Sequence, residues 1–476
     1  MLFPTYIYFA LFLPTALAVY FFLNSKHLTV ASRSWLVICS LFFYSWWDIK
    51  FLPIILFSIL FNYTVGIELG KNRSLGKGVL LAGLAVNLGM LGFFKYANFF
   101  IEIINSTFSS EFGPTDIVLP LAISFFTFQQ VTYLVDSYNG NTREYNFLNY
   151  ALFVTFFPQL IAGPIVHHKE MMPQFQGVRN KLPDFRNLSM GIYLFVVGMF
   201  KKIVIADSLS PYVLQAYGSY QYLSFSDSWI ASLAYTFQLY FDFSGYMDMA
   251  MGSALMFNIR LPVNFDSPYK ALSVREFWKR WHITLGRFLM DHVYIPLGGN
   301  RNSQLNLYFN IMATFVLGGL WHGAGWTFIF WGFLHGIAVI VNRIWDKTGV
   351  KFNRLIAWFL TFNYINITWV FFRAGSWDEA IGMLRGMSGL NDASLHKALN
   401  DHISLFELIP IDFLSNTGEI SIFLILLLII VTFFKTSVQK INNFNPNAAS
   451  ALLIMALGFL SFMSIDNVSE FLYFNF

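Results

Sequence analysis

Long apolar runs, separated by short polar loops, recur along this chain of 476 residues. Several runs are close to, or a little under, the roughly 20 residues that a helix needs to cross the hydrocarbon core of a bilayer. Together with less regular segments they predict about 11 to 13 transmembrane or re-entrant helices, and therefore an all-α polytopic membrane protein. The clearest runs are 4–23, 78–94, 193–205, 329–341, 421–434 and 448–462.

The composition agrees with a membrane protein. Hydrophobic residues make up 56% of the chain and charged residues only 12%, against about 25% in soluble domains. The net charge is +4, but the cations lie in short loops between apolar runs, which is the positive-inside pattern and not a nucleic-acid-binding surface. This pattern predicts a cytoplasmic location for His27, Arg73, Lys181 and Lys347, and an external one for Ser110 and Ser219.

The first run could be a membrane span or a secretory signal, because residues 16–18 have the small-x-small pattern of a cleavage site. Residues 1–4 lack the positive region that a signal carries, so we expect a first span. The single cysteine, Cys39, excludes an intramolecular disulfide framework and a cysteine-based zinc site, and we expect a buried thiol. With no internal repeat or hydrophilic domain, residues 1–476 are predicted to form one integral membrane domain.

Two histidines interrupt the apolar stretch 318–336, and ionisable residues in membrane spans are more often functional than not. His322 and His335 are 13 residues apart. On a continuous helix they would be separated by about 20 Å and about 220°, so they could not share a metal ion. Glycines surround His322, which allows close backbone approach, and a local helix break is also open. We predict no metal site and favour acid-base chemistry by histidine.

The most basic segment, 260–301, contains a second candidate histidine. Ser273 and Glu276 fit a capping box, so a helix is predicted to begin there. His282 then falls on its apolar face, although the helix could simply rest on the membrane surface. That face comprises Trp278, Trp281, His282, Leu285, Leu289 and His292.

Three polar residues lie in the apolar run near residue 240. Asp242 comes one helical turn after Gln238, so both could face a polar interior, whereas Asp248 points elsewhere. Their interpretation as helix-packing residues is favoured over a lining of the route to His322, but both stay open.

Six motifs, in order, resemble those of the membrane-bound O-acyltransferases, most of all the bacterial branch that O-acetylates polysaccharides such as alginate. The resemblance is strongest over residues 1–375, with C-terminal helices expected over 403–476. Ala122 stands where many relatives would have glycine, and Met247 where serine is common. The motifs are LGFFKYANF (91–99), LPLAISFFTF (119–128), FPQLIAGP (157–164), LYFDFSGYMDMA (239–250), EFWKRWHITL (276–285) and GGLWHG (318–323).

The resemblance implies a ring of helices around a central catalytic tunnel. Segments 119–136 and 260–301 are the expected half-spans, and 157–164 is an expected kinked connection. His322 matches the catalytic histidine of the family, and His282 matches the second functional position. The residues expected to line the donor route are Trp321, Trp281, Asp242, Ser244, Lys279 and Arg280.

The resemblance also implies the reaction. An acyl group, most simply acetyl, would pass from a cytoplasmic thioester, acetyl coenzyme A or an acylated carrier, across the bacterial inner membrane to alginate-like exopolysaccharide or peptidoglycan. No bound cofactor is expected. The expected partners are the lipid bilayer, the thioester donor and an extracytoplasmic serine acetyltransferase of the SGNH type. A transporter or flippase, or a structural subunit of a polysaccharide export complex, stays open as an alternative.

Overall fold

The structure is a computed structural model that describes residues 1–71, 76–142, 146–161, 163–301, 303–391, 417–441, 444–465 and 471–472. Throughout these ranges the regular elements are helices, without a strand. Chain contacts divide the molecule into two compact units, Met1–Phe195 with Tyr246–Pro262, and Val196–Gly245 with Val263–Phe476. The predictions for Arg73 and for residues 403–416 lie outside the described residues.

Six helices of the described chain are long and apolar enough to cross a membrane. Two shorter apolar helices, Gly418–Phe433 and Ala448–Met463, follow near the C-terminus. The prediction of an all-α polytopic membrane protein is therefore confirmed, and shorter or more polar helices are candidates for the remaining predicted half-spans. The six are Ile7–Ser25, Ile49–Lys71, Gly76–Phe108, Phe185–Gly218, Trp326–Thr348 and Arg354–Arg373.

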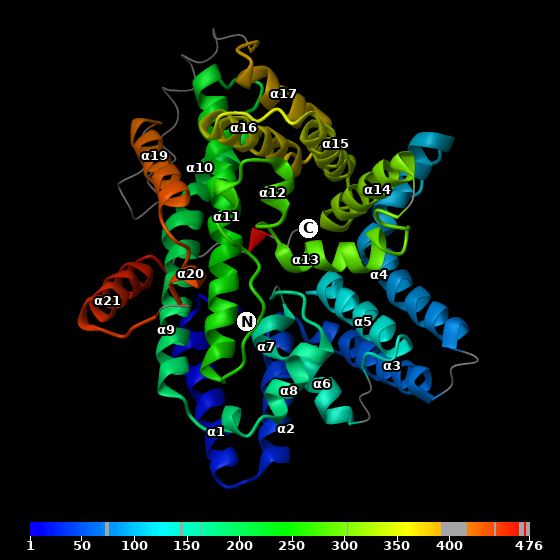
Figure 1. The fold of residues 1–476 in the computed structure, drawn as a ribbon, viewed down its shortest axis with the longest axis vertical. Coiled ribbons are helices and arrows are strands. Elements are labelled where there is room, and N and C mark those ends of the chain that lie inside the picture. The colour runs from blue at the N-terminus through cyan, green and yellow to red at the C-terminus, as the bar shows by residue number, and fades with distance from the viewer. Residues whose placement is uncertain are drawn as a thin grey trace. The chain divides into compact units, whose positions relative to one another are not determined.

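In the first unit α2 packs against α1 and α6, and α3, α4 and α5 lie side by side and pack against one another (Figure 1). The Tyr8 hydroxyl is fully buried and donates to Ser253 Oγ at 2.9 Å. Cys39 is buried, as predicted. The helices are α1 (Leu13–Ser25), α2 (Thr29–Ser45), α3 (Leu52–Lys71), α4 (Gly76–Phe108), α5 (Ile123–Tyr138), α6 (Phe147–Thr155), α7 (Phe157–Leu160) and α8 (His168–Gln176).

The expected half-span 119–136 contains α5, whose residues are almost all buried. Ala122 precedes α5 with a left-handed backbone, φ 63°. Glycine is the residue that adopts this conformation without strain, which explains why glycine is expected at this position. The expected kink at 157–164 is confirmed, because α6 ends at Thr155 and a new short helix with Pro158 in its first turn follows.

The second unit holds the segments that carry both candidate histidines. Helices α9 and α11 contribute residues to both units. The helices concerned are α9 (Phe185–Met199), α10 (Asp207–Gly218), α11 (Phe225–Met256), α12 (Val274–Trp278), α13 (Ile283–Leu289), α14 (Gln304–His322), α15 (Trp326–Thr348), α16 (Arg354–Arg373), α17 (Trp377–Met387), α19 (Thr417–Phe433), α20 (Ser437–Ile441) and α21 (Ala448–Met463).

Helices α14 and α15 pack against each other through glycines. A Cβ atom on Gly319 would collide with the carbonyl oxygen of Phe328, and one on Gly332 would collide with that of Phe315. Only glycine lets the two backbones approach so closely, which confirms the predicted close backbone approach at Gly319, three residues before His322. This contact fixes the end of α14, where His322 lies.

Candidate functional site

His322 is the last residue of α14 and is 2% exposed. The chain is extended at Gly323 and Gly325, and α15 begins at Trp326. Stretch 318–336 is thus two helices joined by a short glycine-rich turn, and the helix break left open by the sequence is present. The turn places His322 at a helix C-terminus.

His282 lies in a second break and is completely buried. The prediction of one helix from Ser273 through His292 is wrong, because α12 ends at Trp278 and α13 begins only at Ile283. Between them, His282 adopts the left-handed conformation with φ 45°. The predicted cap is present in part: Ser273 Oγ accepts from the Glu276 N–H, but Glu276 Oε2 accepts from the N–H of Leu272.

The helix break at His282 is explained by Asn264, a residue that the sequence analysis did not identify. Its carbonyl accepts the Ile283 N–H at 3.1 Å, and its Oδ1 accepts both the N–H and the hydroxyl of Thr284 at 3.1 and 3.0 Å. These donors are therefore turned away from the i−4 carbonyls that a continuous helix would use. The spacing of apolar residues does not indicate which backbone N–H groups the side chain of an isolated asparagine will bind in the folded chain.

The two breaks bring the imidazoles of His282 and His322 together, although 40 residues separate them in the chain. Their ring centroids are 6.2 Å apart. The Trp321 ring lies beside both, 6.0 Å from His282 and 4.9 Å from His322. Further rings lie against one histidine or the other: Phe243 is 4.9 Å from His282, and Trp331 and Phe372 are 5.2 and 5.1 Å from His322.

The two nitrogens of the buried His282 ring can serve different purposes. A neutral imidazole carries one N–H donor and one acceptor nitrogen. In that form the ring can polarise or orient a neighbouring carbonyl without acting as a cation.

Trp281, although adjacent to His282, belongs to an aromatic layer beside the histidine pair. It is fully buried and stacks on Phe277 with ring centroids 5.5 Å apart. Its ring also lies 5.0 Å from Phe265 and 5.1 Å from Trp369. Its contacts are those of a core tryptophan, and its expected place on the donor route stays a prediction.

Asp242 takes part in a buried ionic cluster that sequence reasoning also missed. Lys202 Nζ lies 2.8 Å from Asp242 Oδ1 and 2.6 Å from Asp207 Oδ1. The other oxygen of Asp242 accepts the N–H of Leu472 at 3.0 Å. These contacts favour the helix-packing interpretation of Asp242. Ser244, two residues on, is buried, and its hydroxyl has no hydrogen-bond partner among the described residues.

The cations of the basic segment differ in their availability. Arg280 binds Glu276 Oε1 at 2.8 Å and also donates to the carbonyl of Asp266. Arg275 forms an exposed ion pair with Asp346 at 3.4 Å. Lys279 is exposed. Of these three cations, Lys279 is thus the one best placed to attract an anionic ligand.

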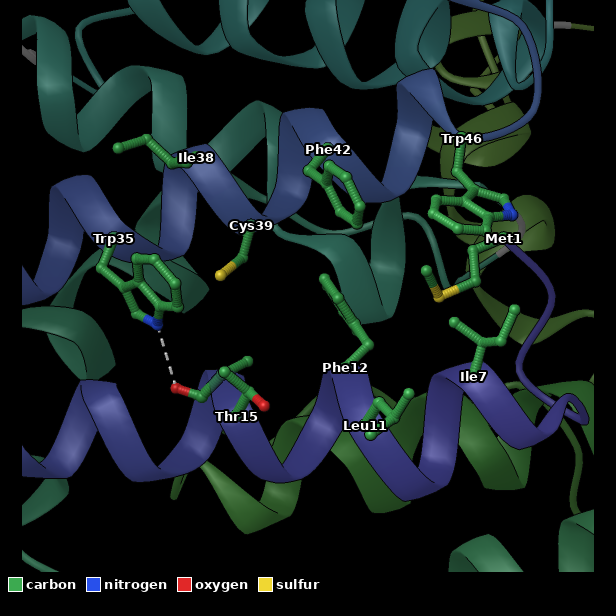
Figure 2. A pocket seen from close by; sticks show the side chains of 11 residues that line it. Met1, Ile7, Leu11, Phe12, Thr15, Trp35, Ile38, Cys39, Phe42 and Trp46 are labelled. Atoms are coloured by element: carbon green, nitrogen blue, oxygen red, sulfur yellow. Dashed lines mark hydrogen bonds between the residues drawn. The ribbon is translucent and has the colours of Figure 1, made fainter.

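Two further observations concern metal binding and a pocket outside this site. Within the described ranges, no three His, Cys, Asp or Glu side chains are grouped so that they could hold a metal ion. A pocket of about 420 Å³ in the first unit lies between α1 and α2 and is almost entirely apolar (Figure 2). It is lined by Met1, Ile7, Leu11, Phe12, Thr15, Ala16, Trp35, Ile38, Cys39, Phe42 and Trp46.

Comparison with known proteins agrees with the motifs. The family model described as "MBOAT, membrane-bound O-acyltransferase family" matches residues 81–374 of this chain. The peptidoglycan O-acetyltransferase of Helicobacter pylori is 43% identical and aligns with 100% of this chain and 98% of its own length. The probable alginate O-acetylase of Azotobacter vinelandii is 38% identical over 83% of this chain and 79% of its own. A teichoic acid D-alanyltransferase of Streptococcus thermophilus is 27% identical over 53% of this chain and 68% of its own.

Proposed function

Because this chain belongs to the membrane-bound O-acyltransferase family, it is a multi-pass membrane acyltransferase, and we propose that His322 and His282 carry its chemistry. The observation that supports this assignment is that the ring centroids of the two buried imidazoles lie 6.2 Å apart. Membership in this family also sets aside the transporter and structural-subunit alternatives.

His322 acts as the general base. Its imidazole accepts the proton of the acceptor hydroxyl while the hydroxyl oxygen attacks the thioester carbonyl carbon. The C–S bond then breaks, and the departing thiolate takes the proton back from the imidazolium. His322 ends α14, and the partial negative charge of a helix C-terminus stabilises such a transient cation by about 0.3–1 kcal/mol.

His282 acts on the other side of the same carbonyl. A neutral imidazole with its N–H directed at the carbonyl oxygen stabilises the oxyanion that forms during attack. The Asn264 contacts hold the left-handed turn that presents this ring. This contact lowers the barrier because it is stronger with the oxyanion than with the carbonyl oxygen of the ground state.

The donor is a thioester that reaches the histidines from the cytoplasmic side, either acetyl coenzyme A or an acylated carrier protein. Exposed Lys279 attracts its phosphate groups, and the ion pair of Arg275 with Asp346 can open toward the same anion. Single-cysteine labelling in a Cys39→Ser background tests this orientation. Cysteines at positions 181 and 347 should react from the cytoplasm, and cysteines at 110 and 219 from outside. Labelling of position 110 from the cytoplasm alone would invert the orientation.

The final acceptor is a cell-envelope polysaccharide. Peptidoglycan is favoured over alginate because the Helicobacter pylori protein, which is named for peptidoglycan O-acetylation, aligns with the whole chain. The acyl group leaves the bacterial inner membrane on its outer side, where a separate SGNH-type serine acetyltransferase passes it to the polymer.

The test uses purified protein in lipid vesicles with radiolabelled acetyl coenzyme A, or the acetylated carrier, outside. We expect release of free thiol and transfer of the label, both lost in His322→Ala. A His322→Ala protein that transfers acetyl at the wild-type rate contradicts the assignment of His322. Transfer from the carrier but not from coenzyme A would identify the donor.

A further inference from the structure

His335, the second histidine of stretch 318–336, is hydrogen-bonded through both ring nitrogens. Trp278 Nε1 lies 3.1 Å from His335 Nδ1, and Thr368 Oγ1 lies 3.2 Å from His335 Nε2. An indole N–H can only donate, so Nδ1 is the acceptor. The proton of the neutral ring is then on Nε2 and is donated to Thr368, whose own hydroxyl donates to the Ile365 carbonyl at 2.9 Å.

These bonds join three helices around a fully buried ring. Trp278 ends α12, His335 lies within α15, and Thr368 lies on α16. Since α12 leads directly into the turn at His282, the Trp278 bond fixes the start of that turn relative to α15. Both nitrogens are already engaged, so His335 has no free lone pair or proton to exchange with a substrate.

One aromatic side chain contacts both His335 and His322. Trp331, one turn before His335 on α15, packs against the His335 ring with centroids 4.8 Å apart. The Trp331 indole also meets the His322 ring at 5.2 Å, nearly perpendicular at 89°. Trp331 also stacks on Trp369 at 5.5 Å. A shift of His335 therefore moves the ring that sets the orientation of His322.

We propose that His335 is a positioning residue for the acyl transfer. Through its bond to Trp278 and its contact with Trp331, it holds the segments of His282 and His322 in their reacting arrangement. This inference rests on the proposed roles of those two histidines. It gives the two histidines of stretch 318–336 different tasks, one in proton transfer and one in alignment.

The variants separate alignment from simple filling of the core. His335→Phe keeps a ring of similar size but removes both hydrogen bonds, and Trp278→Phe removes only the donor. Each should lower kcat by about 10- to 100-fold, as expected for a small misplacement of reacting groups, with the donor KM within about twofold of the wild type. Because both variants remove the Trp278–His335 bond, the double variant should lose little more than His335→Phe alone. His335→Asn, which keeps an acceptor near the Nδ1 position, should retain most of kcat.

A matched control comes from the first unit. Tyr8→Phe removes one buried hydrogen bond, to Ser253, and should lower the unfolding temperature about as much as Trp278→Phe without changing kcat. Nitrogen-15 labelling of tryptophan provides a readout that does not need turnover. The indole signal lost in Trp278→Phe should shift in His335→Phe.

The outcomes distinguish this inference from the proposed function. If both single variants keep kcat within about twofold of the wild type, or if their losses multiply in the double variant, the positioning role is wrong. A pH–rate profile that loses one limb in His335→Phe would mean that the ring itself transfers protons, which also overturns it. Full activity in His322→Ala would instead contradict the proposed function, while the indole signal would still report on the Trp278 bond.

Discussion

Two buried polar clusters in the second unit differ in almost every respect. The cluster of Lys202, Asp207 and Asp242 is ionic, and the ammonium group lies within 2.8 Å of both carboxylates. The pair of His282 and His322 lies among tryptophan and phenylalanine rings. Each is at most 6% exposed, so burial alone does not separate them.

The difference indicates how to interpret polar residues inside a membrane protein. Charges taken out of water are tolerable when they pair with each other, and a cluster that is satisfied in this way has little capacity left for a substrate. Neutral imidazoles in an aromatic environment can be buried at lower cost and can still take up or release a proton. We therefore infer that the ionic cluster serves structure, and we assign the chemistry to the histidine pair.

Removing His322 gives the largest effect in this comparison. His322→Ala should abolish measurable transfer, and His322→Gln should recover none of it, because an amide cannot accept the proton of the acceptor hydroxyl. Expression and elution as a single species should stay near the wild-type level, since the cavity lies next to several glycines. A His322→Gln protein with substantial activity would exclude a role as general base.

Removing His282 should be less severe. We expect His282→Ala to lower the transfer rate by about two to four powers of ten, which is the range for one oxyanion contact or one acid-base contact. His282→Gln and His282→Asn keep an N–H donor and should recover part of that loss. The transfer rate of each variant at saturating donor distinguishes the two roles. If Gln restores activity at position 322 but not at position 282, the roles are reversed.

Breaking the ionic cluster should affect stability and not chemistry. Lys202→Met leaves two carboxylates buried without their cation, which should cost about 3–5 kcal/mol of unfolding free energy. The triple variant Lys202→Met, Asp207→Asn, Asp242→Asn removes all three charges and should regain most of this loss. Thermal unfolding in detergent measures both, and transfer per folded molecule should stay near the wild-type rate. A loss of kcat per folded molecule in the triple variant would place Asp242 on the donor route.

The sequence predicts the elements better than it predicts their breaks. Six motifs and the apolar runs are enough for the family, the all-α architecture and the choice of His322 and His282. The break at His282 escapes prediction because it depends on Asn264, whose hydrogen bonds to Ile283 and Thr284 exist only in the folded chain. For the same reason the pairing of Asp242 with Lys202, from another helix, has no signature in the local pattern.

Backbone strain extends the comparison to smaller effects. Both His282 and Ala122 have left-handed backbones, with φ of 45° and 63°. For residues with a Cβ atom this conformation costs about 1–2 kcal/mol. At His282 the strain accompanies a ring that we assign to the chemistry, so the cost is offset by function. At Ala122 the side chain is a methyl group with no such role.

Ala122→Gly should therefore stabilise the protein slightly. Glycine relieves the left-handed strain, but it also gives the unfolded chain more freedom, so we expect a net gain of about 0.5–1 kcal/mol. The turn it serves stays intact, because the Phe125 and Phe126 N–H groups donate to the carbonyl of residue 122 whatever its side chain. The unfolding temperature should rise by about 1–2 °C with transfer activity unchanged. His282→Gly is the matched control, since it relieves the same kind of strain but should lose activity as His282→Ala does. A lower unfolding temperature for Ala122→Gly would mean that the Ala122 methyl group contributes packing that exceeds its strain.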